Sequence, residues 1–157
     1  MIRSRVLGGV ATIAAVAGGI LATSAAASAP LHGTGLSTQT DSQPLSQRTA
    51  GPNTIFELLN TRQDVGAFTG TVTEHQWLTV HPDGLITTHA DATLVGTYAG
   101  CGPQVVTQDI HLEGQISPAG VITANFATTG GATVIVHGTV AGTTASNTVT
   151  FTIDYHC

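Results

Sequence analysis

From Ala67 to the C-terminus the chain alternates apolar and polar residues with a period of two, and this feature restricts its fold more than any other. Successive side chains of a β-strand point to opposite faces, so the period indicates strands with one buried face. Threonine, valine and isoleucine, which suit a pleated surface, fill many of the alternating positions. The expected buried residues include Ile86, Ala90, Ala92, Leu94, Tyr98, Val106, Ile110, Leu112, Ile116, Ile122, Ala124, Phe126, Val134, Val136, Val140, Val149, Phe151, Ile153 and Tyr155.

Short turn sequences separate these runs, among them PDG at 82–84, AGCGP at 99–103 and AGTTAS at 141–146. Short links join antiparallel neighbours, and closing such a meander into a barrel removes its open edges. Closure is also favoured by glycines at inward positions, which often mark bends in a barrel wall: Gly70, Gly96, Gly114 and Gly138. We predict an all-β fold, a small up-and-down antiparallel β-barrel of about seven to eight strands, with a β-sandwich as the alternative.

Three segments precede the alternating region. Residues 1–27 combine a basic start, an apolar run and small A-x-A sites, which is the layout of a secretory signal peptide. Residues 28–53 are rich in Ser, Thr, Gln, Gly and Pro, which predicts a disordered linker. The stretch NTIFELLNTRQ fits both strand and helical spacing, and we predict a strand, so that the β-barrel domain would span residues 54–157. We therefore expect a secreted, extracellular protein that keeps no membrane association after processing.

The charge of this domain excludes one class of partner. Arg62 is its only basic residue, and the whole chain has no lysine. Proteins that bind nucleic acid need Lys and Arg to displace the counterions of the phosphates. We therefore expect no nucleic-acid partner, and adhesion to an anionic lipid surface is disfavoured for the same reason.

Cys101 and Cys157 are the two cysteines of the chain, and in an exported protein such a pair predicts a disulfide. In a meander, the strand that ends just before Cys101 and the strand that ends at Cys157 run in the same direction. Both cysteines should therefore lie at one end of the barrel.

The PDG turn fixes the register of the first hairpin of the alternating region. Pro82 and Gly84 fit a three-residue loop built on a type I turn, which pairs Val80 with Ile86 on the inner face. The same register, continued into the next hairpin, predicts two cross-strand rows on the outer face: His75–Asp91–His111 and Trp77–His89–Glu113.

His75, Asp91 and His111 are the candidate metal ligands, because two imidazoles and a carboxylate can hold a divalent ion such as Zn²⁺. Asp91 can equally orient a histidine that acts as a general base. The alternative is a solvated outer wall, where such neighbours contribute only about 0.2–1 kcal/mol per pair. We favour this alternative, and we expect no metal, no cofactor and no catalytic residue.

The sequence is compatible with two states of the barrel interior, one with a cavity and one filled by side chains. Small inward residues such as Ala90, Ala92 and Ala124 would leave room for a small apolar ligand at the barrel mouth. Large residues can instead fill a small barrel, and we predict a filled interior. The residues expected to fill it are Leu94, Leu112, Phe126, Phe151 and Tyr155.

The stretch FTGTVTEHQWLTVHPDGLITTHADATLVGTYAGCG, followed by VTFTIDYHC, resembles small secreted bacterial proteins with an allene-oxide-cyclase-like barrel. The F-x-G-T opening, the PDG turn, the GTYAGCG segment and the terminal aromatic strand carry this resemblance. It implies the barrel fold. The chain does not match the catalytic residues of the plant cyclases, so the resemblance assigns no site residue.

Three functions are consistent with these observations. We predict a non-catalytic extracellular interaction or structural module with an unknown protein partner, which a filled interior would favour. The alternatives are a carrier of a small apolar ligand, favoured by an open cavity without converging polar groups, and a cyclase or isomerase. A cavity that holds an acid or a histidine would favour the cyclase or isomerase.

Overall fold

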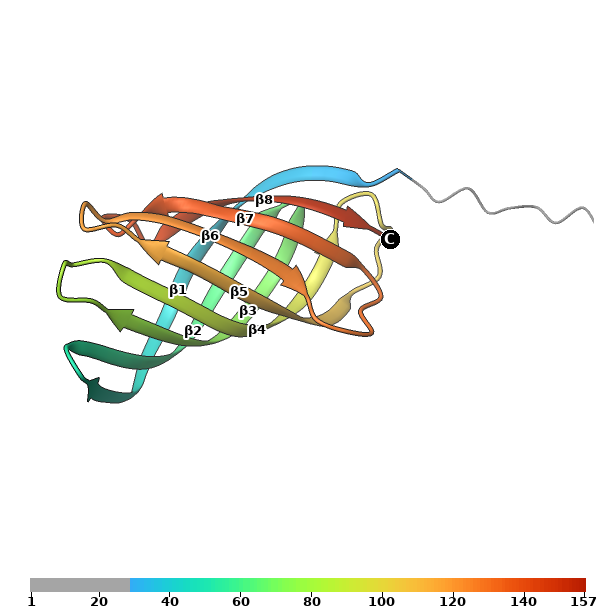
Figure 1. Cartoon of the computed structure of the whole chain (residues 1–157). Coiled ribbons are helices and arrows are strands. Elements are labelled where there is room, and N and C mark those ends of the chain that lie inside the picture. The colour runs from blue at the N-terminus through green and yellow to red at the C-terminus, as the bar shows by residue number, and fades with distance from the viewer. Residues whose placement is uncertain (1–28) are drawn as a thin grey trace, which may run out of the picture.

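The computed structural model describes residues 29–157, which form one closed antiparallel barrel of eight strands (Figure 1). The strands are β1 (Leu31–Ala50), β2 (Asn53–Gly66), β3 (Phe68–Val80), β4 (Ile86–Tyr98), β5 (Val106–Ile116), β6 (Val121–Thr128), β7 (Ile135–Thr143) and β8 (Thr148–His156). Each strand pairs with its neighbours in the sequence, and β1 closes the barrel against β8. The predicted up-and-down barrel is confirmed, and the sandwich alternative is wrong. Within residues 29–157 no helix is long and apolar enough to cross a membrane.

The expected disordered linker at residues 28–53 is wrong, because Leu31–Ala50 forms β1, the longest strand. β1 pairs with β2 from Gly35 to Ala50 and with β8 from Leu31 to Thr38. The barrel therefore begins at residue 31 and not at residue 54. The signal peptide predicted for residues 1–27 lies outside the described residues and stays a prediction.

The inward side of β1 carries small and polar residues, which explains why its composition resembles a linker. Gly33 and Gly35 let the backbone lie close to other strands; a Cβ atom added at Gly35 would lie 2.2 Å from Cζ of Phe151. Ser37 and Gln39 follow on the same side and line the interior. Main-chain hydrogen bonds to two neighbouring strands, rather than apolar burial, fix this segment.

Finer predictions about β2 and about the β3–β4 and β4–β5 hairpins are confirmed. The ambiguous stretch at 53–63 lies in strand β2. At the β3–β4 turn, Val80 pairs with Ile86, and Gly84 adopts the left-handed region with a φ of 83°. The predicted register also continues into the β4–β5 hairpin, where Asp91 lies opposite His111.

The inward glycines make room for aromatic rings. Gly70 and Gly96 face each other across β3 and β4, and a Cβ atom at Gly96 would lie 2.8 Å from Cζ of Phe68. A Cβ atom at Gly138 would lie 2.3 Å from Cζ of Phe126. A larger residue at these positions would displace a ring from the interior.

Aromatic residues fill one end of the barrel. The ring centroids of Phe68 and Tyr98 lie 4.9 Å apart, and those of Tyr98 and Tyr155 lie 5.4 Å apart. All three side chains are buried. Val134 and Val136 belong to the same buried cluster. This end, where the links β2–β3, β4–β5 and β6–β7 lie, is packed solid.

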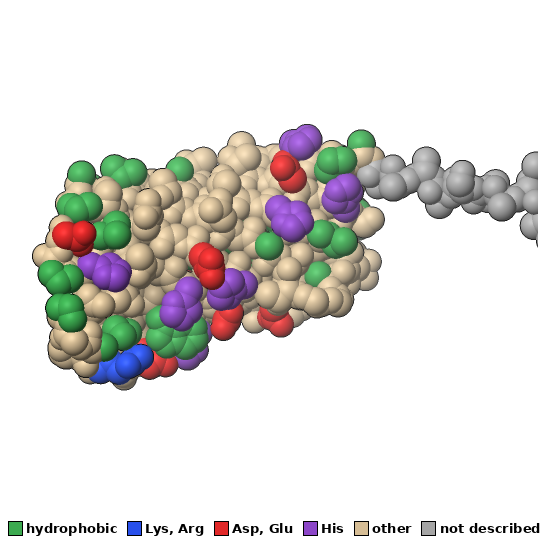
Figure 2. Space-filling model, in the orientation of Figure 1, with side chains coloured by type: hydrophobic (Ala, Val, Ile, Leu, Met, Phe, Trp, Pro, Cys, Tyr) green, Lys and Arg blue, Asp and Glu red, His purple; other side chains and the backbone are tan. Residues whose placement is uncertain are grey.

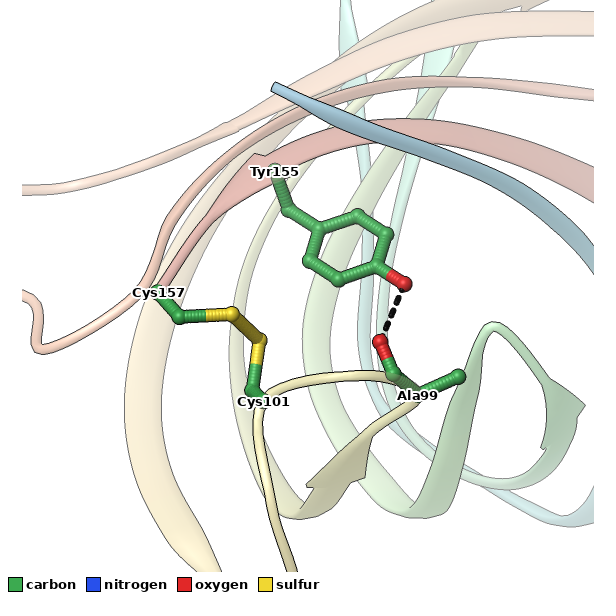
Figure 3. The surroundings of a disulfide bond; sticks show 4 residues. All are labelled: Ala99, Cys101, Tyr155 and Cys157. Carbon is green, nitrogen blue, oxygen red and sulfur yellow. Dashed lines mark hydrogen bonds between the residues drawn. A yellow bond between two sulfur atoms is a disulfide. The ribbon is translucent and has the colours of Figure 1, made fainter. Parts of the chain in front are cut away.

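The predicted disulfide is confirmed at the same end. Cys101 and Cys157 are bonded, with their Cα atoms 5.5 Å apart (Figure 3). Beside the bridge, the Tyr155 hydroxyl donates a hydrogen bond of 2.6 Å to the carbonyl oxygen of Ala99. The bridge therefore joins the β4–β5 link to the C-terminus. We call this the disulfide end, and the opposite end, with the β1–β2, β3–β4, β5–β6 and β7–β8 turns, the turn end.

Candidate functional site

The interior holds a cavity of about 450 Å³, so the prediction of a filled barrel is wrong. Its lining extends from the β7–β8 turn, residues 144–147, at the turn end to Phe68 and Tyr98 near the disulfide end. Near the turn end Leu58, Leu78, Ile116 and Ile122 line the cavity and are only half-buried. The volume is within the range that holds small organic ligands.

One side of the cavity wall is apolar and comes mainly from β4 to β8. Leu94, Leu112, Phe126 and Phe151 were expected to fill the barrel, and they line this wall instead. Ala124 lies among them, and its small side chain leaves space. The remaining apolar residues of this wall are Ile110, Ile116, Ile122, Val136, Val140, Val149 and Ile153.

The other side of the wall comes from β1, β2, β3 and the start of β4 and carries most of the polar side chains, with Leu58, Phe68, Val72 and Leu78 among them. We call its polar part the polar wall. It includes a chain of hydrogen bonds across the strands. Ser42 donates to Asn60 at 2.7 Å, Asn60 donates to Gln76 at 2.8 Å, and Gln76 donates to Thr88 at 3.0 Å. This chain holds the amide groups of Asn60 and Gln76 in fixed orientations.

Arg62 and Glu74 lie in the same polar wall. The guanidinium Nε of Arg62 donates to Ser37 at 2.9 Å, and Nη1 donates to Gln39 at 3.4 Å. Nη1 also lies 3.8 Å from a carboxylate oxygen of Glu74. Burial raises the pKa of Glu74, against the opposing effects of Arg62 and Asn60. Arg62 thus already contacts three protein side chains.

Asp64 is the least satisfied group of the polar wall. Its side chain is buried, and Oδ1 has no hydrogen-bond partner within residues 29–157. Burial raises its pKa to about 6, although Ser37 and Arg62 lower it and Glu74 adds to the rise. A buried acid with a perturbed pKa and an unpaired oxygen is a candidate functional group.

Tyr98 closes the cavity on the side of the disulfide end. Its hydroxyl accepts a hydrogen bond of 2.5 Å from Gln108 Nε2, and the other polar atom of that amide, Oε1, has no partner in the described chain. Burial raises the pKa of Tyr98 well above its usual value, and Asp64 adds to this effect. The phenol therefore stays protonated.

Sequence reasoning missed this polar wall, although the signal was present in part. Glu74 and Gln76 are in phase with Val72 and Leu78 in the period-two pattern of β3, so they had to point inward. Asn60, Arg62 and Asp64 alternate in the same way along β2. Polar residues at inward positions are the signal for a lined cavity, and the apolar pattern alone does not reveal it.

The predicted outer rows have the predicted register but not all of the expected contacts. His111 Nδ1 lies 2.8 Å from Oδ1 of Asp91. His75 contacts a carboxylate from the other neighbouring strand, with its Nε2 2.6 Å from Oε1 of Glu57. The row therefore divides into two separate pairs. Figure 2 shows histidine and carboxylate side chains on one outer face, with hydrophobic side chains beside some of them.

The Trp77 ring lies close to one histidine of each predicted row. Its ring centroid lies 4.1 Å from that of His75 and 4.9 Å from that of His89, to which it is stacked. Glu113 contacts His111 at 3.4 Å, so the second row also differs from a simple cross-strand series. A hydrogen bond to Asp91 raises the pKa of His111, as expected for a partly solvated pair.

Among the described residues, no group of three or more His, Cys, Asp and Glu side chains is placed to hold a metal ion. The candidate ligands His75, Asp91 and His111 are each part of a histidine–carboxylate pair on the outer wall. Their role as solvated surface stays a prediction, and the cavity is the stronger candidate site.

A scan against protein-family models finds no match to this chain, and a search of curated proteins finds none either.

Proposed function

We propose that this protein binds a small, largely apolar molecule inside its barrel and acts as an extracellular carrier. The observation that carries the proposal is the cavity of about 450 Å³ with one apolar and one polar wall. Such a division suits a molecule with an apolar body and a few polar groups, because buried polar groups of the protein need partners. A cavity of this kind argues against the interaction or structural module, which a filled interior would have favoured.

Two observations support the extracellular part of the proposal. Residues 1–27 have the layout of a signal peptide, and the Cys101–Cys157 disulfide is compatible with an oxidising compartment. N-terminal sequencing of the protein from culture supernatant should begin near Ser28. An intact Met1 on protein that is retained in the membrane would contradict export.

Ligand binding can be tested with a neutral fluorescent apolar probe, N-phenylnaphthylamine. The wild-type protein should bind it with a rise in fluorescence. Ala124→Phe should abolish binding, because the added ring would occupy the cavity. The matched control is Thr123→Phe, which adds the same ring to the neighbouring exposed position of β6 and should leave binding unchanged. No binding by the wild type, or equal binding by both variants, would refute the proposal.

A second function, that of a cyclase or isomerase, is favoured by Asp64. An acid with a pKa of about 6 can give a proton to a bound molecule and later take one back. Such an exchange rearranges the molecule without changing its mass. Incubation with an extract of the producing cells should then yield a compound of altered retention time and unchanged mass. Asp64→Asn should stop this conversion but retain probe binding; an equal yield from the variant would exclude Asp64 as the acid.

A further inference from the structure

The charges that line the cavity restrict the chemistry of its ligand. Two carboxylates, Asp64 and Glu74, face the interior, and Arg62 is the only cationic side chain among the described residues that line it. Arg62 already contacts Ser37, Gln39 and Glu74. An anionic ligand would therefore meet carboxylates without gaining an unengaged cation, and burying its charge would be unfavourable.

The unpaired oxygen of Asp64 indicates what the ligand should supply. An ionised carboxylate only accepts hydrogen bonds, whereas a protonated one can also donate. A hydroxyl group can match both states, because it donates one hydrogen bond and accepts others. A ligand carboxylate can only accept, so it would leave the ionised Asp64 oxygen unpaired and would repel it.

The position of Asp64 indicates how the ligand would be oriented. Asp64 pairs with Gly70 in β3 and with Ser37 in β1, close to the aromatic residues of the disulfide end. The half-buried Leu58 and Leu78 lie toward the turn end. The polar group of the ligand should therefore lie deep in the barrel, and the apolar body should extend toward the turn end.

We propose that the cavity selects apolar molecules that carry a neutral hydroxyl, binds them with the hydroxyl at Asp64 Oδ1, and rejects the corresponding carboxylates. This inference rests on the proposed function and specifies its ligand class. The hydrogen bond from the ligand hydroxyl satisfies the buried oxygen, and the apolar chain contacts the wall formed by β4 to β8.

The test measures displacement of the fluorescent probe N-phenylnaphthylamine by n-decanol and by decanoate, two competitors with the same chain length and different head groups. At about pH 8, where Asp64 is ionised, n-decanol should displace the probe at least about tenfold more effectively than decanoate, as expected for a hydrogen bond to a charged group. Asp64→Leu should weaken n-decanol binding about tenfold, after each displacement is corrected for the affinity of the same variant for the fluorescent probe. Asp64→Asn should reduce the discrimination against decanoate. The control is Asp109→Asn, which removes an exposed carboxylate of β5 and should change nothing.

The outcomes separate this inference from the proposed function. If the wild type does not bind N-phenylnaphthylamine, the proposed function fails. If it binds the probe but decanoate displaces it as well as n-decanol does, ligand binding stands and the hydroxyl inference is overturned. Equal displacement by n-decanol and decanoate on the wild type overturns the hydroxyl inference even if an Asp64 variant does not fold.

Discussion

At the scale of single residues, Asp64 is held in a site that opposes its ionisation. Its side chain is buried in the polar wall, and Glu74 lies nearby with a pKa that burial also raises. Arg62 offsets part of the cost of ionising Asp64, but its guanidinium also contacts Ser37 and Glu74. A protein keeps such a group at a cost in stability, which is common where a ligand is bound or a proton is moved.

The raised pKa of Asp64 predicts how stability depends on pH. In the folded state this pKa is about 6, against 3.8 for the ordinary carboxyl, so between these values the unfolded state binds fewer protons than the folded state. The free energy of unfolding should therefore decrease as the pH rises through this window, by about 3 kcal/mol from this group. Glu74 acts in the same direction.

Asp64→Asn should remove that part of the pH dependence. The variant should be more stable than the wild type at about pH 8, and the difference should disappear near about pH 4. Urea denaturation of the variant and the wild type over a series of pH values measures this difference in stability. A difference between the two proteins that stays constant with pH would contradict this prediction.

The outer histidines should contribute little to stability. The His111 side chain is 40% exposed, as is that of His75, and exposed pairs with carboxylates are weak and screened by salt. The double substitution His75→Ala, His111→Ala should change the free energy of unfolding by no more than about 1 kcal/mol. Calorimetry with Zn²⁺ should detect no tight site. Stoichiometric binding at micromolar concentration that the double variant loses would restore the metal-site hypothesis.

At the scale of the strand, β1 has two halves with different surroundings. From Gly35 to Thr38 it pairs with both β2 and β8, whereas its later part pairs with β2 alone. Register shifts occur in this later part between Gln39 and Asp41 and between Pro44 and Ser46. Bulges and a proline are common devices that protect an edge strand from pairing with other chains.

Deletion of β1 tests whether this segment is a necessary strand of the barrel or a dispensable linker. A chain that begins at Asn53 would leave the paired edges of β2 and β8 open, so we expect aggregation and loss of cooperative unfolding. A chain that begins at Ala29 retains all eight strands and serves as the control. Size-exclusion chromatography and thermal unfolding measure the two outcomes. A monomeric shorter chain with an unchanged transition would show that β1 is dispensable.

At the scale of the whole molecule, the barrel has one solid end and one open end. Aromatic packing and the disulfide lie together at the solid end, where Cys157 ties the C-terminus to the β4–β5 link. The cavity extends from beneath this packing to the other end, where apolar side chains are only half-buried. The packed end thus supplies a rigid support for the cavity walls.

Removal of the disulfide should destabilise the whole barrel. The bridge joins residues 56 positions apart, and the chain-entropy model gives about 4 kcal/mol for a loop of this length. The double substitution Cys101→Ser, Cys157→Ser should therefore lower the free energy of unfolding by about that amount in urea denaturation. The reduced wild type should behave like this variant. Two free thiols in the unfolded, non-reduced protein would show that the bridge is absent.

The sequence by itself determined the barrel architecture, the register of the β3–β4 and β4–β5 hairpins and the disulfide. Alternation with period two and short turns are local patterns, and a slip of one residue at Val80 and Ile86 would have exposed the apolar face. The position of Cys101 after one strand and of Cys157 at the end of another then followed from the direction of the strands.

Only the tertiary structure decided that β1 belongs to the barrel and that the interior is open. Ser37 has no apolar signature, and its position inside becomes evident once β1 lies between β2 and β8. The phase of Asn60, Asp64 and Glu74 indicates an inward direction, but it does not show that they line a cavity. Closure brings residues far apart in the sequence into one wall, where hydrogen bonds and charge, rather than apolar burial, determine how they pack. The pKa of Asp64 arises from that enclosure, because the low polarity of the closed interior disfavours its charge.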